Sequence, residues 1–186
     1  DSAPRAIAEA LSVFRDPVRF YRAGDYADAV RTVESAQRLI SAAYSPIGLD
    51  FVAYRTPFSL MNSEEIARDA SAERDPFHAS FVAIAERVRA AGVQLVGLSV
   101  AFPGQIQPAF SLAYTLKQLL PELYVTVGGP ALTQMLLRLK PEALGRALGP
   151  FDSAVAYEGE FALLELIEKL ERGERPVVQD QHLGAG

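Results

Sequence analysis

The chain has 186 residues, 49% of them hydrophobic, and a formal net charge of -5 at pH 7, which suits one folded domain with a small appendage. Lysine and arginine are dispersed without forming a basic stripe, so we expect no nucleic-acid partner. The absence of cysteine excludes disulfides, thiolate zinc sites and any iron-sulfur cluster held by this chain. No apolar run reaches the length of a membrane span and no signal peptide is visible, so we predict a cytoplasmic protein without a membrane partner.

The first 48 residues are predicted to form an N-terminal helical segment, 1–48. Apolar residues recur at helical spacing over 4–43, with a break near Asp16-Pro17, which predicts a pair of helices. Residues 49–55 then alternate well enough to predict a strand.

The next part, 49–173, is predicted to be an α/β domain. After a short helix near Asn62, a longer one is expected to run to Ala91, with Asp75 as its N-cap and Pro76 in its first turn. Strands are then predicted over 95–100, 123–127 and 151–157, and helices over 108–120, 131–148 with a break at Pro141, and 161–172. Three successive β-α units predict a doubly wound, mainly parallel sheet with helices on both faces. The remaining residues, 174–186, are predicted to be a linker or tail.

Small or acidic residues stand where the three predicted strands end. They are Ser99, the pair Gly128 and Gly129, and the carboxylates Glu158 and Glu160. Because the ends of parallel strands meet at one edge, where α/β proteins bind ligands, these residues predict a ligand crevice. Each has a structural explanation as well: a tight turn for the glycines, a cap for Ser99, and interaction with a helix dipole for the glutamates, for which we expect no catalytic role.

The ordered motifs VGLSV, VTVGGP and FDSAVAYEGE, each followed by a helix, resemble the cobalamin-binding domain that precedes the radical S-adenosylmethionine module in many Fe-S oxidoreductases and methyltransferases. The resemblance covers about residues 80–173. It implies a Rossmann-like or flavodoxin-like sheet whose C-terminal edge holds the nucleotide tail of cobalamin. The residues that it places at the cofactor are Ser99, Val100, Gly128, Gly129, Pro130, Tyr157, Glu158 and Gly159.

The resemblance also implies a partner. S-adenosylmethionine and a 4Fe-4S cluster would lie in a radical catalytic module of the same polypeptide, outside this chain. The chain itself would then contribute neither a catalytic residue nor a metal ligand. It begins at Asp1 without a methionine, which we interpret as a piece excised from a longer protein.

Histidine coordination of the cobalt is not expected. The better-known cobalamin proteins replace the lower cobalt ligand with a histidine from an Asp-x-His-x-x-Gly motif, and this sequence has no such motif. We expect His78 to be a surface helix residue and His182 to belong to the tail. Cobalamin would therefore bind in a form without a histidine ligand.

The family's first β-α unit is predicted to be missing. Related domains begin with a strand and a helix, whereas this chain begins with helices, and residues 1–60 resemble the variable segment that follows that unit. We therefore expect weak or no cobalamin binding by this chain. The bare edge of the strand over 95–100 would be covered by residues 50–55 as a substitute strand, or by a second copy in a homodimer.

Other classes of protein are less well supported. The main alternative is a structural or protein-interaction domain that binds no cofactor. The segment 24–29 resembles half of a tetratricopeptide unit, but one partial copy cannot bury a continuous core. A receiver domain needs an acceptor aspartate where Ser99 and Ala101 stand, and the Gly-x-Gly-x-x-Gly turn of a dinucleotide site is absent.

Overall fold

The structure is a computed structural model that describes residues 2–57 and 63–176. The chain divides into two compact units, Asp1–Pro57 and Phe58–Gly186. Each unit has its own cluster of buried apolar side chains.

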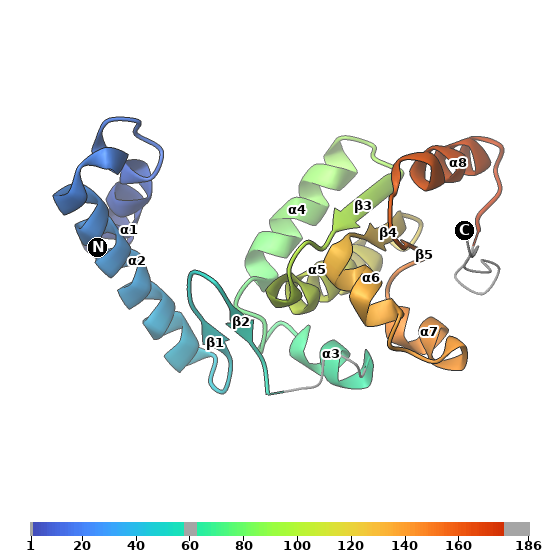
Figure 1. Ribbon diagram of the computed structural model, residues 1–186, viewed down its shortest axis with the longest axis horizontal. Coiled ribbons are helices and arrows are strands. Elements are labelled where there is room, and N and C mark those ends of the chain that lie inside the picture. The colour runs from blue at the N-terminus through green and yellow to red at the C-terminus, as the bar shows by residue number, and fades with distance from the viewer. Residues whose placement is uncertain (1, 58–62, 177–186) are drawn as a thin grey trace. The chain divides into compact units, whose positions relative to one another are not determined.

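The first unit is a helical hairpin followed by a small β-hairpin (Figure 1). Helix α1 (Ser2–Val13) and helix α2 (Ala23–Ala43) flank the short 3-10 helix η1 (Arg19–Tyr21), which confirms the predicted pair of helices. Asp16 shapes the connection, because its side chain accepts hydrogen bonds from two following backbone N–H groups at 2.8 and 3.0 Å. The side chains buried between the helices are Ala10, Val13, Ala29 and Val33.

The single strand predicted over 49–55 is wrong. The structure has two short strands there, β1 (Gly48–Leu49) and β2 (Tyr54–Arg55), which pair with each other in antiparallel fashion. Asp50 folds the chain back, since its carboxylate accepts hydrogen bonds from the N–H groups of the second and third residues after it, at 2.9 and 2.8 Å. Because β1 and β2 form a separate sheet, the idea that this segment is a substitute strand beside 95–100 is also wrong.

The second unit alternates helices with three parallel strands. Its elements are α3 (Ser63–Asp69), α4 (His78–Ala90), β3 (Leu95–Ser99), η2 (Pro103–Gln105), α5 (Ile106–Leu119), β4 (Tyr124–Gly128), α6 (Pro130–Leu136), α7 (Pro141–Leu148), β5 (Ser153–Val155) and α8 (Glu160–Glu171). The strands lie in the order β3-β4-β5, and their register pairs Ser99 with Gly128, and Gly128 with Val155. The chain is therefore an α/β protein with a parallel sheet, and the predicted ends of the three strands lie side by side.

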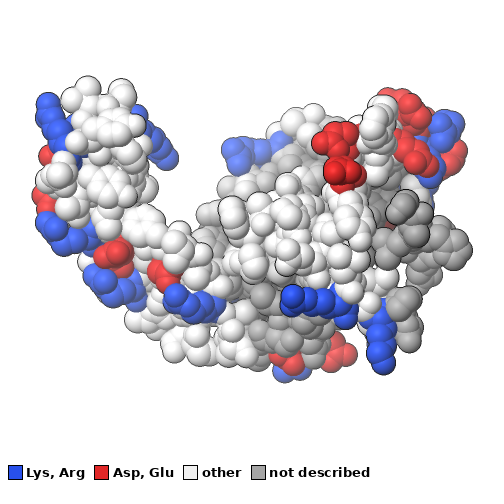
Figure 2. Space-filling model, in the orientation of Figure 1, with Lys and Arg blue, Asp and Glu red and all other residues white. Residues whose placement is uncertain are grey.

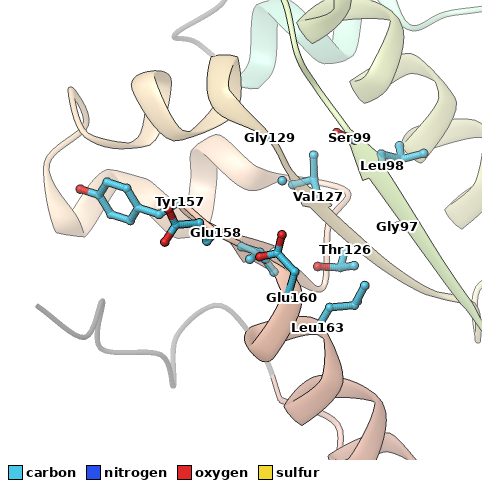
Figure 3. Close-up of a pocket in the computed structure, with 13 residues that line it drawn as sticks. Gly97, Leu98, Ser99, Thr126, Val127, Gly129, Tyr157, Glu158, Glu160 and Leu163 are labelled. Carbon is cyan, nitrogen blue, oxygen red and sulfur yellow. The ribbon is translucent and has the colours of Figure 1, made fainter. Parts of the chain in front are cut away.

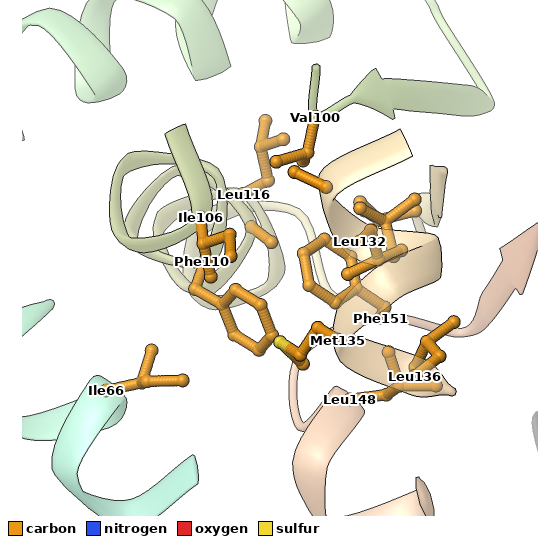
Figure 4. Packing of buried hydrophobic residues seen from close by; sticks show 14 of the residues in the cluster. Ile66, Val100, Ile106, Phe110, Leu116, Leu132, Met135, Leu136, Leu148 and Phe151 are labelled. Atoms are coloured by element: carbon orange, nitrogen blue, oxygen red, sulfur yellow. The ribbon is translucent and has the colours of Figure 1, made fainter. Parts of the chain in front are cut away.

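One face of this sheet carries the hydrophobic core. Val96, Leu98, Val125 and Val127 alternate along β3 and β4 and join a cluster of side chains from α4, α5 and α6. At its centre the rings of Phe110 and Phe151 meet edge to face, with centroids 4.8 Å apart (Figure 4). The main apolar cluster of the second unit thus lies on one side of its sheet.

Helices α4 and α5 begin two or more residues away from their predicted starts. Helix α4 begins at His78, because Asp75, whose side chain is buried, accepts a hydrogen bond from the backbone N–H of Phe77 and holds a turn before the helix. Helix α5 begins two residues before Pro108, which is tolerated there because the N–H groups of a first helical turn have no helical partner. The break at Pro141 separates α6 from α7, as predicted.

Within the described ranges, no helix combines the length and the apolar character needed to cross a membrane.

Candidate functional site

A cavity of about 480 Å³ lies on the face of the sheet opposite the core (Figure 3). This volume falls within the range of small-molecule pockets. Its floor comes from β3 and β4, and its walls come from the loop after β5 and the start of α8. The lining residues are Gly97, Leu98, Ser99, Thr126, Val127, Gly128, Gly129, Val155, Tyr157, Glu158, Gly159, Glu160 and Leu163.

The cavity brings together most of the residues that the sequence singled out. Six of the eight predicted cofactor residues line it: Ser99, Gly128, Gly129, Tyr157, Glu158 and Gly159. Val100 and Pro130 are not among the lining residues. The side chain of Val100 belongs to the core on the other face and is 1% exposed, because successive strand residues point to opposite faces. Pro130 begins helix α6.

The floor contains residues that the sequence analysis missed. Gly97 and Thr126 face each other across β3 and β4, and Leu163 of α8 stands at the side. The hydroxyl of Thr126 donates a hydrogen bond to the carbonyl oxygen of Ser153 at 3.3 Å and accepts one from the Ser153 hydroxyl at 2.8 Å. These bonds occupy the polar part of Thr126, so its methyl group gives the floor an apolar surface. The sequence did contain a signal for Gly97: a glycine inside a predicted strand often marks a place where another group approaches the backbone closely.

The double glycine is required by the fold itself. Gly129 has φ of +102°, and an added Cβ there would lie 2.6 Å from the carbonyl oxygen of Val100. The backbone of Val100 donates to the Gly128 carbonyl at 2.8 Å and accepts from the Ala131 N–H at 3.1 Å. The turn from β4 into α6 is therefore bonded directly to the end of β3. This contact explains Gly129 without a ligand, while an added Cβ at Gly128 would lie 3.1 Å from the carbonyl oxygen of Val155.

Tyr157 forms part of the cavity mouth through its backbone. It has φ of +64°, an unusual value for a residue with a large side chain, and such strain of about 1–3 kcal/mol persists only where neighbours fix the backbone. Here its N–H donates to the hydroxyl of Thr133 at 3.1 Å, and that hydroxyl donates to the Gly129 carbonyl at 3.0 Å. The two loops at the mouth are thus bonded together, while the Tyr157 ring points away from Gly97 and Ser99 (Figure 3).

The charged groups at the cavity are carboxylates. Glu158 and Glu160 stand at its rim, and its lining from the described part of the chain includes no lysine, arginine or histidine. Over the face that Figure 2 shows, lysine and arginine are scattered among aspartate and glutamate rather than gathered in one patch. Carboxylates accept hydrogen bonds and repel anions, so the rim favours a ligand that offers amide or hydroxyl donors over one with a free phosphate.

Among residues 2–57 and 63–176, no three histidine, cysteine, aspartate or glutamate side chains come together in a way that would hold a metal ion. His78 lies at the start of α4 and does not line the cavity. His182 lies outside the described residues.

The lining would suit the ring of a cobalamin tail, although its described residues offer no cation for the phosphate of that tail. A floor of backbone and methyl groups admits a flat ring, and the rim carboxylates would accept hydrogen bonds from the amide groups around a corrin. No histidine of the lining would coordinate the cobalt.

No family model matches the sequence, and neither a curated protein nor a solved structure matches the chain significantly. Fold and site define the chain as an α/β protein with a three-stranded parallel sheet and a cavity on the face that its core does not use.

Proposed function

We propose that this chain is the cobalamin-binding-like accessory domain of a radical S-adenosylmethionine enzyme, and that its cavity holds the nucleotide tail of cobalamin. One observation carries the proposal. The residues that the resemblance assigns to the cofactor come from three separate loops, and six of them line one cavity of ligand size. The chain has no catalytic residue in this function. It binds the cofactor and orients it.

The topology supports a larger, doubly wound sheet in the parent enzyme. Helix α4 contributes Ala85 and Val88 to the core face and leads directly into β3. Crossovers between parallel strands are right-handed. A strand that precedes α4, which lies on the core face, would therefore lie on the side of β3 that faces away from β4. In the described region β3 pairs only with β4. A preceding β-α unit in the parent polypeptide would fill this edge and cover the open side of the cavity.

Each part of the site has a role in this proposal. Gly97 and Thr126 give the tail an apolar floor, and the hydroxyl of Ser99 offers it one polar partner. Glu158 and Glu160 accept hydrogen bonds from the amides of the corrin. Bound cobalamin supplies a cobalt centre for methyl transfer or radical chemistry in the catalytic module, which holds S-adenosylmethionine and the 4Fe-4S cluster. A cytoplasmic location belongs to the proposal, because such clusters need a reducing compartment.

Equilibrium dialysis of the chain against hydroxocobalamin, with absorbance spectra of the bound fraction, tests the proposal. We expect weak or no binding by this chain, because in the described residues no strand pairs with the second edge of β3. The spectrum should lack histidine coordination and should be the same in the control variant His78→Ala. Absence of saturable binding both by this chain and by a longer polypeptide that restores the upstream β-α unit would overturn the cobalamin assignment. A histidine-coordinated spectrum that disappears in His78→Ala would refute binding without a histidine ligand.

A structural domain that binds no cofactor is the second candidate. It is favoured by apolar side chains on α8, where Phe161 is 88% and Leu164 53% exposed. These residues would dock on the catalytic module of the same polypeptide. The free edge of β3 could also be covered by pairing with the same edge of a second copy. Light scattering would distinguish this dimer from a monomer by its mass. This candidate predicts no saturable binding of cobalamin at any concentration.

A further inference from the structure

Helix α8 carries a stripe of exposed apolar side chains. Phe161, Leu164 and Ile167 follow one another at a spacing of three residues, which places them on one side of the helix, and they are 88%, 53% and 37% exposed. The buried residue of α8 is Leu166. None of the three belongs to the core cluster of the described residues or lines the cavity. The stripe is therefore a surface separate from the candidate ligand site.

Carboxylates extend this stripe into the last turn of α8. Glu168 is four residues on from Leu164, and Glu171 is four residues on from Ile167, so each stands one turn beyond an apolar side chain of the stripe. Neither has an ion-pair partner among residues 2–57 and 63–176. The last turn of a helix favours cations, because its free carbonyl groups carry partial negative charge. The helix dipole thus explains neither carboxylate.

The nearby cations are bound to other carboxylates. Lys169 is the only lysine or arginine within α8, and it is five residues on from Leu164, so it lies about 140° around the helix from that side chain. Its Nζ atom lies 2.6 Å from the carboxylate of Glu165. The Nε atom of Arg172, directly after the helix, lies 2.8 Å from the carboxylate of Glu174. Acidic side chains therefore border the apolar stripe, and Figure 2 shows them gathered over α8.

We propose that this stripe docks an amphipathic helix from outside this chain, whose apolar face is bordered by lysine and arginine. Helices pack through side chains three and four residues apart, which is the spacing that the stripe offers. Lysine or arginine of the partner helix would lie against Glu168 and Glu171. The docking surface is independent of the cobalamin assignment, because the stripe does not line the cavity.

The charges disfavour two other occupants. In a symmetric pair of copies with Leu164 on the two-fold axis, antiparallel helices would place Glu168 opposite Glu160 of the other copy, and like charges repel. Anionic lipids would be repelled in the same way. A basic helix is the occupant whose charge complements this border.

Three fluorescein-labelled synthetic peptides of about 18 residues, or five helical turns, test the proposal by fluorescence anisotropy with the full chain. The first has leucine at amphipathic-helix spacing and lysine elsewhere. The second has the same leucines with glutamate in place of lysine, and the third has the composition of the first in an order that forms no apolar face. We expect the first to bind saturably and the other two about tenfold more weakly or less. No saturable binding of the first peptide, or equal binding of either control peptide, would overturn the proposal.

Removing the stripe should have the larger effect. The double variant Phe161→Ser, Leu164→Ser should weaken binding of the first peptide about tenfold or more, because a few central apolar side chains carry most of the energy of an interface. Leu137→Ser is the matched control, since Leu137 is 57% exposed and lies outside α8, and it should leave binding unchanged. Equal losses in both would overturn the proposal. So would a dimer of the parent chain that the double variant dissociates, or binding of phosphatidylglycerol vesicles that the double variant loses.

Removing the acidic border should have the smaller effect. Glu168→Gln with Glu171→Gln should weaken binding of the first peptide about fivefold and reduce its dependence on salt concentration. Glu73→Gln with Glu86→Gln removes the same charge from exposed positions elsewhere in the second unit and should change neither. Equal effects of the two double variants would overturn the role of the border. Hydroxocobalamin binding should be the same in all these variants, so failure of the docking proposal and failure of the proposed function are distinguishable.

Discussion

The two faces of the parallel sheet are built for different purposes. On one face, valine and leucine side chains of β3 and β4 pack under α4, α5 and α6, and the buried ring of Phe110 is 0% exposed. On the other face the same strands present Gly97, Ser99 and Gly128, with a cavity above them. Adjacent residues of one strand therefore point in turn to the core and to the cavity, and substitutions on the two faces should have separable effects on stability.

The largest difference should appear when a large side chain is removed from each face. Phe110→Ala removes a fully buried ring from the core and should cost about 3–5 kcal/mol of unfolding free energy. Leu163→Ala removes a side chain that is 39% exposed at the cavity wall and should cost less than about 1 kcal/mol. Urea unfolding curves of the two variants measure both values. Similar losses would mean that the cavity face is part of the core.

The glycines of the cavity floor should differ almost as much. Gly129→Ala forces a side chain into a left-handed backbone position and against Val100, so we expect a loss of about 2–4 kcal/mol. Gly97→Ala should instead be neutral or stabilise the fold by up to about 1 kcal/mol. Thermal unfolding followed by circular dichroism tells them apart, and a stable Gly129→Ala protein would contradict the turn geometry.

A smaller effect is expected at the end of the sheet away from the cavity. Lys117 donates hydrogen bonds to both oxygens of the Asp152 carboxylate at 2.9 Å, and the N–H of Val125 donates to the same group at 2.7 Å. Asp152→Ala leaves these donors without their acceptor and should cost about 1–3 kcal/mol. Ligand binding at the cavity should be unchanged after correction for the folded fraction. A selective loss of binding in Asp152→Ala would show that the two ends of the sheet are coupled.

The smallest effect concerns pH. Burial raises the pKa of Tyr124, on the cavity face, and that of Tyr114, in α5, above the ordinary value of 10.0. Since the folded state holds these protons more tightly than the unfolded state, the stabilisation is complete below pH 10 and is lost as the pH rises through the folded pKa values. Urea midpoints measured at about pH 8 and about pH 11 should fall with pH in the parent chain. Tyr124→Phe should reduce this fall without removing it, because Tyr114 remains.

The positions of the strands and the break at Pro141 could be predicted from sequence because short apolar runs and proline act locally. The hairpin of β1 and β2 could not, since a single side chain, that of Asp50, folds the chain back inside an alternating pattern. The loop residues of the site could be predicted because α/β proteins bind ligands at the carboxyl ends of their parallel strands. The place of Gly97 and Thr126 in the cavity floor could not be predicted. It depends on which face of the sheet the core helices leave open, and that is a property of the whole fold.

In the proposed function, the face of the sheet opposite the core binds the ligand. The most direct measurement is a two-dimensional nitrogen-proton spectrum of the labelled chain during titration with hydroxocobalamin. We expect amide signals to move for Gly97, Ser99, Gly128 and the segment 157–159, while those of the core residues Phe110 and Leu132 stay in place. Shifts confined to residues 2–57 or to the core face, or no shifts even in a longer polypeptide that restores the upstream β-α unit, would refute binding at this face.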